Sequence, residues 1–464
     1  MLERRTAVTE KPNLEWSPDS WKTKAEAQHV HYEDVPALDA AVSRLRGLPP
    51  LVTSWEIEKL KDLLGDAQEN KRFLVQGGDC AESIADCRST VIANKLKILL
   101  QMSLVLIHSG QRPVIRVGRF AGQYAKPRSK PTETRDGVEL PSYFGDLVNR
   151  PEFTEAARRA DPQLLLEAYQ HAALTLNFIR SLSAAGFADV HHPEYWEVSF
   201  FKRAALPENI REEYERTTRQ LSEALRFMEA LGENTVEELT RVDFFTSHEG
   251  LNLHYEAAQT RTVPRRPGHY DLTAHFPWIG ERTRGLDGAH VEFFRGVRNP
   301  IGIKVGPTAP PDEIVRLIER LSPEDERGKI ALVTRMGAAR VSDALPALVE
   351  RVKRAGRRVL WVSDPMHGNM QVTKSGTKTR NFDDILREVE LSFDIHAQAG
   401  GHLGGVHFEL TGEDVTECIG GAANITEADL DKNYATMCDP RLNYRQALEM
   451  SFRIAKRMAP ANNR

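Results

Sequence analysis

Eight short apolar runs recur along this chain, and they constrain its fold more than any other feature of the sequence. They lie at residues 73–76, 114–118, 242–246, 275–279, 301–305, 330–334, 359–363 and 406–410. The runs are rich in β-branched or aromatic residues and lack a strict apolar–polar alternation, which is typical of strands buried on both faces of a parallel sheet. Helical patterns separate the later runs, as at 311–321 and 343–355. Alternating β and α elements of this number predict an α/β fold of the (β/α)8 TIM-barrel type.

Two segments fall outside this alternation. We expect residues 1–66 to form an N-terminal extension and residues 67–464 to form the catalytic barrel domain. Residues 119–241 separate the second and third strands and are too long for one βα unit. Within them, 119–150 has the composition of a loop, and we expect an amphipathic helical insertion at about 200–235.

Chemically capable side chains stand at or just beyond the ends of the predicted strands. They are Cys80, Arg119, Glu249, Glu281, Arg282, Lys304, Arg335, His367 and Glu409. In a barrel the carboxyl ends of all strands converge on one mouth, where active sites are built. The sequence therefore predicts a single site assembled from segments that are far apart in the chain.

Four residues of metal-binding type are candidates for one centre. They are Cys80 in QGGDC, His367 in DPMHGN, Glu409 in GGVHFELTG and, near the C-terminus, Asp439 in CDPRLN. A thiolate, an imidazole and two carboxylates suit a divalent metal such as Mn, Co, Fe or Zn. Taken singly, Cys80 could be a small buried apolar residue and Asp439 a turn residue before Pro440. The placement of three of the four at one mouth favours the metal site.

The segment GRFAGQYAKPRSKP (118–131) is a basic loop that suits a phosphate group. Its polar side chains are Arg119, Lys126, Arg128, Ser129 and Lys130. Arginine can bind two phosphate oxygens and lysine adds a point charge, although a solvated surface loop has the same composition. With Arg282, Lys304 and Arg335 the cations outnumber the nearby carboxylates, which predicts a substrate with two anionic groups. The alternative is a set of salt bridges around the barrel rim.

The bulk composition argues against several kinds of partner. The chain has 464 residues, a net charge of −4 and a pI near 6.5, which gives no reason to expect nucleic acid or a membrane as partner. Its first residues lack the apolar core of a signal peptide, and the apolar stretch 98–107 is too short to cross a bilayer. Four cysteines in such a chain predict free thiols and a cytoplasmic protein.

Nine strings in the chain resemble those of the class II 3-deoxy-D-arabino-heptulosonate 7-phosphate (DAHP) synthases. They are QGGDCAE, GRFAGQYAKPRS, SHEGL, WIGERTR, IKVGP, TRMG, DPMHGN, GGVHFELTGEDVTECIGG and CDPRLN. The resemblance runs from about residue 45 to the C-terminus in the same order. It implies a (β/α)8 transferase that condenses phosphoenolpyruvate with D-erythrose 4-phosphate and water, which is the first step of the shikimate pathway to aromatic amino acids.

The resemblance also implies roles for individual residues. The implied metal ligands are Cys80, His367, Glu409 and Asp439, with manganese favoured. The implied phosphoenolpyruvate ligands are Arg119, Glu281, Arg282, Lys304 and Arg335. The implied ligands of the erythrose 4-phosphate phosphate are Lys126, Arg128 and Ser129. Lys304 and Glu249 are candidates for proton transfer. The family further implies a homodimer or homotetramer, inhibition by aromatic amino acids and, in some members, association with chorismate mutase.

Some positions depart from the family pattern, which leaves the metal and substrate preference open. They are Phe144, Ser363, Met370 and the stretch 28–34. One alternative function is that of a secondary-metabolism paralogue, which would supply phenazines or use an amino sugar phosphate. Others are a catalytically silent regulatory partner and an unrelated metal-dependent barrel hydrolase. Because Cys438 precedes Asp439, we also expect it near Cys80, where oxidation would link the two thiols.

Overall fold

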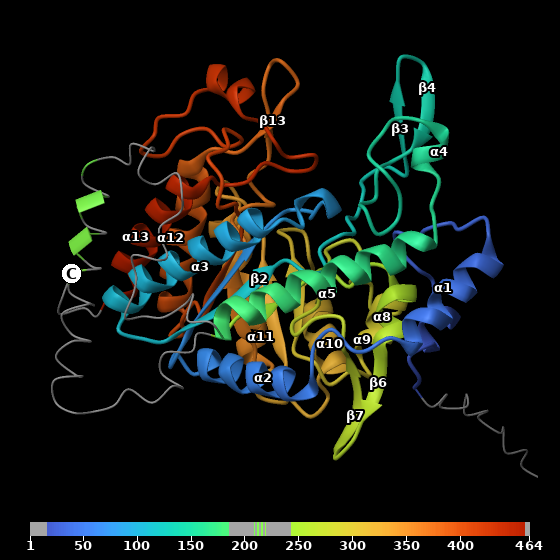
Figure 1. Cartoon of the computed structure of the whole chain (residues 1–464). Coiled ribbons are helices and arrows are strands. Elements are labelled where there is room, and N and C mark those ends of the chain that lie inside the picture. The colour runs from blue at the N-terminus through green and yellow to red at the C-terminus, as the bar shows by residue number, and fades with distance from the viewer. Residues whose placement is uncertain are drawn as a thin grey trace, which may run out of the picture.

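The computed structural model describes residues 16–184 and 243–459, together with positions 208, 211, 212, 215, 216 and 219. Its centre is a curled sheet of eight parallel strands in the order β5-β2-β1-β14-β11-β10-β9-β8 (Figure 1). The strands are β1 (Phe73–Gly78), β2 (Val114–Arg119), β5 (Phe245–Thr246), β8 (Trp278–Ile279), β9 (Ile301–Val305), β10 (Ile330–Thr334), β11 (Leu360–Ser363) and β14 (Gly405–Glu409). Each lies within or overlaps one predicted apolar run, so the strand predictions are confirmed.

The first and last strands of this order also meet. The Trp278 N–H donates to the His248 carbonyl at 3.0 Å, the Gly250 N–H donates to the Trp278 carbonyl at 3.0 Å, and Glu249 forms a parallel bridge with Trp278. Pro277 has no backbone N–H, which limits the length of β8. These contacts make the curled sheet consistent with the predicted TIM-like barrel.

Helices cover the outside of the sheet. They are α3 (Ser89–Gly110), α8 (Leu253–Gln259), α9 (Ala289–Phe294), α10 (Pro311–Leu321), α11 (Val341–Arg354), α12 (Phe382–Gln398) and α13 (Tyr444–Met458). The predicted helices at 311–321 and 343–355 correspond to α10 and α11. Helix α10 begins at a proline, with Asp312 and Glu313 in its first turn, and buries Ile314, Leu317, Ile318 and Leu321 on one face.

Helix α3 combines length with apolar composition to a degree that no other helix of the described residues reaches. Its 22 residues are long and apolar enough to cross a membrane by length and composition, but 72% of its most apolar window is buried within the fold. It packs against α13 on one side and against β1 and β2 on the other. This burial is what a core helix of a globular protein shows.

The N-terminal segment supplies a helix that closes the amino end of the sheet. The segment contains η1 (Ser20–Thr23), α1 (Val35–Gly47) and α2 (Ser54–Gln68). Leu60, Leu64 and Ala67 of α2 are buried in the same apolar cluster as the side chains inside the sheet. The predicted division into an extension and a barrel domain stays a prediction, but α2 packs directly onto the barrel.

The prediction of a loop at 119–150 is wrong in part, because this segment contains a hairpin of β3 (Thr132–Arg135) and β4 (Val138–Pro141). Asp136 and Gly137 at its tip have φ of +50° and +81°, as the turn of a two-residue hairpin requires. The hairpin projects from the body on the side opposite α2 (Figure 1). The predicted helical insertion at about 200–235 lies outside the described residues, apart from the few positions given above.

The remaining elements are one 22-residue helix and several short connections and ribbons. They are η2 (Ile84–Asp86), α4 (Glu155–Arg158), α5 (Gln163–Ala184), the ribbon of β6 (Thr260–Val263) and β7 (Arg266–Asp271), the ribbon of β12 (Gln371–Val372) and β13 (Lys378–Thr379), and η4 (Glu427–Lys432). The β12–β13 ribbon lies on the same side of the sheet as the β3–β4 hairpin (Figure 1). Both therefore stand near the carboxyl ends of the strands.

Candidate active site

One cavity of about 830 Å³ opens at the carboxyl ends of the strands. Every residue predicted from the sequence for the site lines it: Cys80, Arg119, Lys126, Arg128, Ser129, Glu249, Glu281, Arg282, Lys304, Arg335, His367, Glu409 and Asp439. These residues come from strands and loops throughout the chain. The fold therefore assembles the predicted set at one place, while the individual roles stay predictions.

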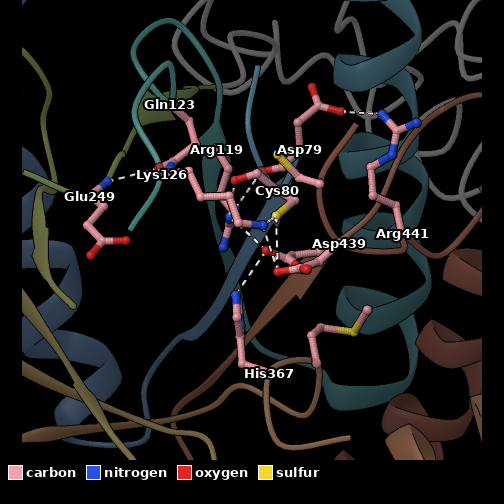
Figure 2. A network of polar contacts seen from close by, with 12 residues as sticks. Asp79, Cys80, Arg119, Gln123, Lys126, Glu249, His367, Asp439 and Arg441 are labelled. Atoms are coloured by element: carbon pink, nitrogen blue, oxygen red, sulfur yellow. Dashed lines mark hydrogen bonds and ion pairs between the residues drawn. The ribbon is translucent and has the colours of Figure 1, made fainter. Parts of the chain in front are cut away.

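Three of the four metal-ligand candidates form one cluster, and the fourth, His367, contacts a member of it. The Cys80 Sγ and one carboxylate oxygen each of Glu409 and Asp439 lie within 4.8 Å of one another. The His367 Nε2 lies 3.0 Å from the Glu409 Oε1, and its ring points toward this group (Figure 2). A thiol, an imidazole and two carboxylates in this proximity form a donor set that fits a divalent transition metal.

Asp364 orients the imidazole of His367. The His367 Nδ1 lies 2.7 Å from the Asp364 Oδ2, so the carboxylate engages this nitrogen and turns the Nε2 toward Glu409. Burial raises the pKa of Asp364, but the charges of His367 and Lys304 more than offset this and hold the pKa well below its usual value. Metal-binding histidines commonly use a carboxylate partner in this way. Asp364 lies three residues before His367 but was not among the residues predicted for the site.

Glu409 is fully buried between two guanidinium groups. The Arg119 side chain donates to its Oε1 at 3.0 Å and the Arg380 side chain to its Oε2 at 2.7 Å. Burial raises the pKa of Glu409, but His367, Arg380 and Arg119 bring it well below its ordinary value. Arg380 also donates to the carbonyl of Pro440. Sequence reasoning missed Arg380, because it follows a two-residue ribbon strand rather than a strand of the central sheet.

Arg119 contacts both sides of the metal-ligand group. Its Nε donates to the Asp79 carbonyl at 2.8 Å, and its terminal nitrogens donate to the Cys80 carbonyl at 3.0 Å, to Glu409 and to the His407 Nε2. These contacts use most of the donors of the guanidinium. Arg119 therefore has little capacity left for a substrate anion and mainly holds Cys80 and Glu409 in place.

Lys126 lies among the metal-ligand candidates rather than beside Arg128 and Ser129. Its Nζ is 2.6 Å from the Cys80 Sγ and 2.6 Å from the Asp439 Oδ2 (Figure 2). The Lys378 Nζ lies 3.1 Å from the other Asp439 oxygen. Burial raises the pKa of Asp439. The positive charges of Lys126, Arg380 and Lys378 outweigh this effect, so the pKa lies below its usual value. The sequence analysis did not identify Lys378.

The outer part of the cavity carries the other cations of the basic loop. The Arg128 side chain donates to the Glu133 Oε1 at 3.1 Å, and its backbone N–H donates to the Gln28 Oε1 at 2.6 Å. The Arg282 side chain donates to the Ser129 hydroxyl at 3.0 Å. This contact joins the residue groups that were predicted to bind the two substrates.

The inner part of the cavity contains Lys304, which is 5% exposed. Its Nζ pairs with the Asp364 Oδ2 at 2.5 Å and lies 5.6 Å from the centre of the Trp278 ring. Burial lowers the pKa of Lys304 to about 8, with a further contribution from Arg119 and an opposing one from Asp364. Arg335 lies nearby and donates to the His367 carbonyl at 2.9 Å.

Two glutamates line the cavity opposite the metal-ligand group. Burial raises the pKa of Glu249, and its Oε1 has no hydrogen-bond partner among the described residues. Its backbone N–H donates to the Gln123 Oε1 at 2.9 Å. Glu281 accepts from the Gly306 N–H at 2.6 Å and pairs with Arg284 at 2.9 Å. Glu249 is thus the carboxyl group with a free oxygen.

Cys438 lies beside Cys80, as its position in the sequence predicted. A hydrogen-bond contact with the Cys80 thiol, aided by the charge of Lys126, lowers the pKa of Cys438 to about 7, while burial opposes this shift. Burial and the same contact raise the pKa of Cys80 well above its usual value. All four cysteines are free thiols.

Known proteins resemble the chain over nearly its full length. The class-II DAHP synthetase family model matches residues 16–455. A phospho-2-dehydro-3-deoxyheptonate aldolase from Streptomyces coelicolor is 48% identical over 447 residues, which cover 96% of this chain and 98% of the relative. The protein of the same name from Neurospora crassa is 46% identical over 456 residues, and this alignment covers 95% of this chain and 94% of the relative. A third relative, from Mycolicibacterium smegmatis, is 44% identical over 428 residues, and this alignment covers 91% of this chain and 90% of the relative.

Proposed function

The chain belongs to the class-II DAHP synthetase family, and from this premise we propose that its cavity condenses phosphoenolpyruvate with D-erythrose 4-phosphate and water. The products are 3-deoxy-D-arabino-heptulosonate 7-phosphate and inorganic phosphate, and the reaction opens the shikimate pathway to aromatic amino acids. The observation that carries the proposal is the assembly of the metal-type donors and the cations in one cavity of about 830 Å³.

A divalent metal ion, with manganese favoured, would be held by Cys80, His367, Glu409 and Asp439. The fit is supported by the proximity of their donor atoms and by Asp364, which leaves the His367 Nε2 as the available nitrogen. When bound, such an ion supplies a Lewis acid that polarises the aldehyde oxygen of erythrose 4-phosphate.

We assign phosphoenolpyruvate to the inner part of the cavity. Its carboxylate and phosphate would lie over the face of Trp278. They would be bound by Lys304, Arg335, Arg282 and the remaining donor of Arg119. Glu281 would act indirectly, since it holds Gly306 and Arg284 at the same wall. An anion beside buried Lys304 stabilises its ammonium charge. This favours the inner position for phosphoenolpyruvate, which carries both a carboxylate and a phosphate.

Erythrose 4-phosphate would bind with its phosphate at the guanidinium of Arg128 and the hydroxyl of Ser129, in the outer part of the cavity. Lys126 would then lie between this phosphate and the metal-ligand group, because it contacts Cys80 and Asp439. The contact between Arg282 and Ser129 supports adjacent positions for the two substrates. The aldehyde end would accordingly face the four metal ligands.

The reaction forms one carbon–carbon bond and one carbon–oxygen bond, the latter to water, and breaks the carbon–oxygen bond to the leaving phosphate. The methylene carbon of phosphoenolpyruvate bonds to the aldehyde carbon, water adds to the carbon that carries the phosphate, and the bond from that carbon to the phosphate oxygen breaks. One proton of the water ends on the former aldehyde oxygen and the other leaves with inorganic phosphate. Lys304 and Glu249 are our candidates for moving these protons, because their shifted pKa values bring both nearer to neutral pH.

Phosphate release on mixing the two substrates tests the proposal. We expect release to require both substrates and Mn²⁺, to stop with a chelator and to be lost in Cys80→Ala. A preference for an amino or imino analogue of erythrose 4-phosphate would instead identify a secondary-metabolism paralogue. Metal-loaded protein that binds phosphoenolpyruvate without releasing phosphate would identify a silent partner, and release without erythrose 4-phosphate would identify a hydrolase.

We further propose that the protein is cytoplasmic, forms a homodimer or homotetramer, and responds to aromatic amino acids or a chorismate mutase partner. Light scattering would give the oligomeric state. Assays with Phe, Tyr and Trp, singly and combined, and with added chorismate mutase would test regulation, and unchanged activity throughout would contradict it.

A further inference from the structure

Asp439 lies outside the sheet that positions the other proposed ligands. It belongs to the segment between β14 and α13. The backbone of this segment is hydrogen-bonded to the sheet at Leu442. The Leu442 N–H donates to the Glu409 carbonyl at 3.0 Å, and the Thr411 N–H donates to the Leu442 carbonyl at 2.9 Å. Nevertheless the Asp439 Oδ2 lies 3.7 Å from the Cys80 Sγ, across 359 residues of chain. Something besides the strand register must set this spacing.

Arg441, two residues after Asp439, makes the required connection. Its Nη1 donates to the Asp79 Oδ1 at 2.7 Å, and Asp79 immediately precedes Cys80 (Figure 2). Its Nε and Nη2 donate to the two oxygens of Glu417 at 3.0 and 2.8 Å, and its backbone N–H donates to the same carboxylate at 2.7 Å. A planar guanidinium bound in this bidentate manner has a fixed orientation.

The partners of Arg441 are themselves buried and fixed. Lys95 of α3 pairs with the second oxygen of Asp79, and both side chains are almost completely buried, as is Glu417. Burial raises the pKa of Asp79, but Lys95 and Arg441 offset this and keep the pKa below its usual value. The two acids and two bases, Asp79, Glu417, Lys95 and Arg441, form a charge-balanced group that we call the Arg441 clasp.

We propose that Arg441 is a positioning residue that sets the distance between Cys80 and Asp439 through the clasp. The inference rests on the proposed metal centre and deepens it. Asp79 fixes the chain one residue before the thiolate, and Arg441 fixes the chain two residues after the carboxylate. Because both belong to one ion pair, loss of the pair removes the link between these two backbone positions and leaves Lys126 as the side chain that still contacts both ligands. Neither residue lines the substrate cavity, so substrate anions should not sense the change directly.

A fold-stabilising ion pair without a positioning role would look the same in the structure. The positioning role and the purely stabilising role differ in the property that the ion pair controls. A positioning role predicts weaker metal binding and an altered ligand arrangement in protein that is still folded. A purely stabilising role predicts a loss of stability in the metal-free protein, with metal affinity unchanged wherever the protein is folded.

Cobalt binding separates these alternatives. Co²⁺ bound to a thiolate gives a charge-transfer absorption, and its dissociation constant can be measured by chelator competition. The variants are Arg441→Met, Asp79→Asn and the double variant. Arg445→Met is the matched control, because Arg445 lies in the same region but pairs with Asp414 at 3.1 Å. Cys80→Ala establishes that the absorption comes from the proposed centre.

We expect each single variant to weaken Co²⁺ binding about 10- to 100-fold and to reduce the charge-transfer band. The double variant should be no weaker than the worse single variant, because both changes break the same pair. Arg445→Met should match the wild type. If Arg441→Met does not fold, Asp79→Asn gives the same test with the side-chain shape retained.

Two results would overturn the inference in distinguishable ways. If the wild type binds Co²⁺ with a band that Cys80→Ala removes, and folded Arg441→Met or Asp79→Asn keeps both affinity and band, the clasp has no positioning role and the metal centre stands. Additive losses in the double variant would likewise reject the clasp. If the wild type itself shows no band that depends on Cys80, the proposed metal centre fails and the clasp fails with it.

Discussion

Titration of Lys304 should control the affinity for phosphoenolpyruvate above pH 8. In the substrate-free protein its pKa lies at about 8, mainly because the ammonium group is buried. A bound anion would favour the charged lysine and raise this pKa. Below pH 8 the lysine already carries its proton, so the affinity should be nearly constant. Above pH 8 binding must take up a proton, so the affinity should fall as the pH rises.

The size of the effect follows from the shift in pKa. The difference between the ordinary value of 10.5 and about 8 corresponds to about 3 kcal/mol for keeping the ammonium charged in this setting. If phosphoenolpyruvate cancels this cost, its dissociation constant rises about eightfold between pH 7.5 and pH 9. The largest total change at still higher pH is about 300-fold.

Calorimetric titration with phosphoenolpyruvate, in two buffers of different ionisation enthalpy, measures both the affinity and the proton uptake. Lys304→Arg should bind with little pH dependence, because a guanidinium keeps its charge throughout this range. Lys130→Arg is the matched control, since Lys130 is an exposed lysine of the same cavity, and it should keep the dependence. A pH-independent affinity in the wild type, or the wild-type slope in Lys304→Arg, would refute the reasoning.

Two further changes test other parts of the cavity. In Gly280→Ala the added Cβ would lie 1.9 Å from the Glu249 Oε1, so the carboxylate must move, and we expect kcat to fall about 100-fold if Glu249 transfers a proton. Gly285→Ala has no atom within 4 Å of its added Cβ and should keep full activity; equal activity in both variants would exclude this role. Mild oxidation with diamide should join Cys80 to Cys438, release the metal and be reversed by dithiothreitol. Intact thiols by mass spectrometry, with metal and activity retained, would contradict this prediction.

The strands were predictable because a parallel sheet covered on both faces requires continuous apolar runs. The β3–β4 hairpin has no such run, since its residues are half-buried or exposed. Its signal was the pair Asp136–Gly137, whose left-handed conformations suit a tight hairpin turn. The composition of the surrounding segment, rich in proline and cations, obscured that signal.

The residues that support the site were harder to predict than the residues that line it. The lining residues follow strand ends, and topology brings strand ends together. Arg380 and Arg441 instead act through contacts with residues 29 and 362 positions away, respectively Glu409 and Asp79. No periodicity or local motif encodes such a pairing. Only the packed structure reveals it.

The excess of cations seen in the sequence is also partly taken up by carboxylates in the structure. Counting charges treats every arginine and lysine at the mouth as available to a substrate. In the structure Arg119 donates to Glu409, Lys126 to Asp439 and Lys304 to Asp364. The first two hold groups of the proposed metal centre, so their loss should act mainly on metal affinity. Cations such as Arg282, which contacts only a hydroxyl among the described residues, should act mainly on the Michaelis constants for substrate. Metal affinity and substrate affinity measured on one set of variants would therefore sort the cations into two groups that the sequence presents as one.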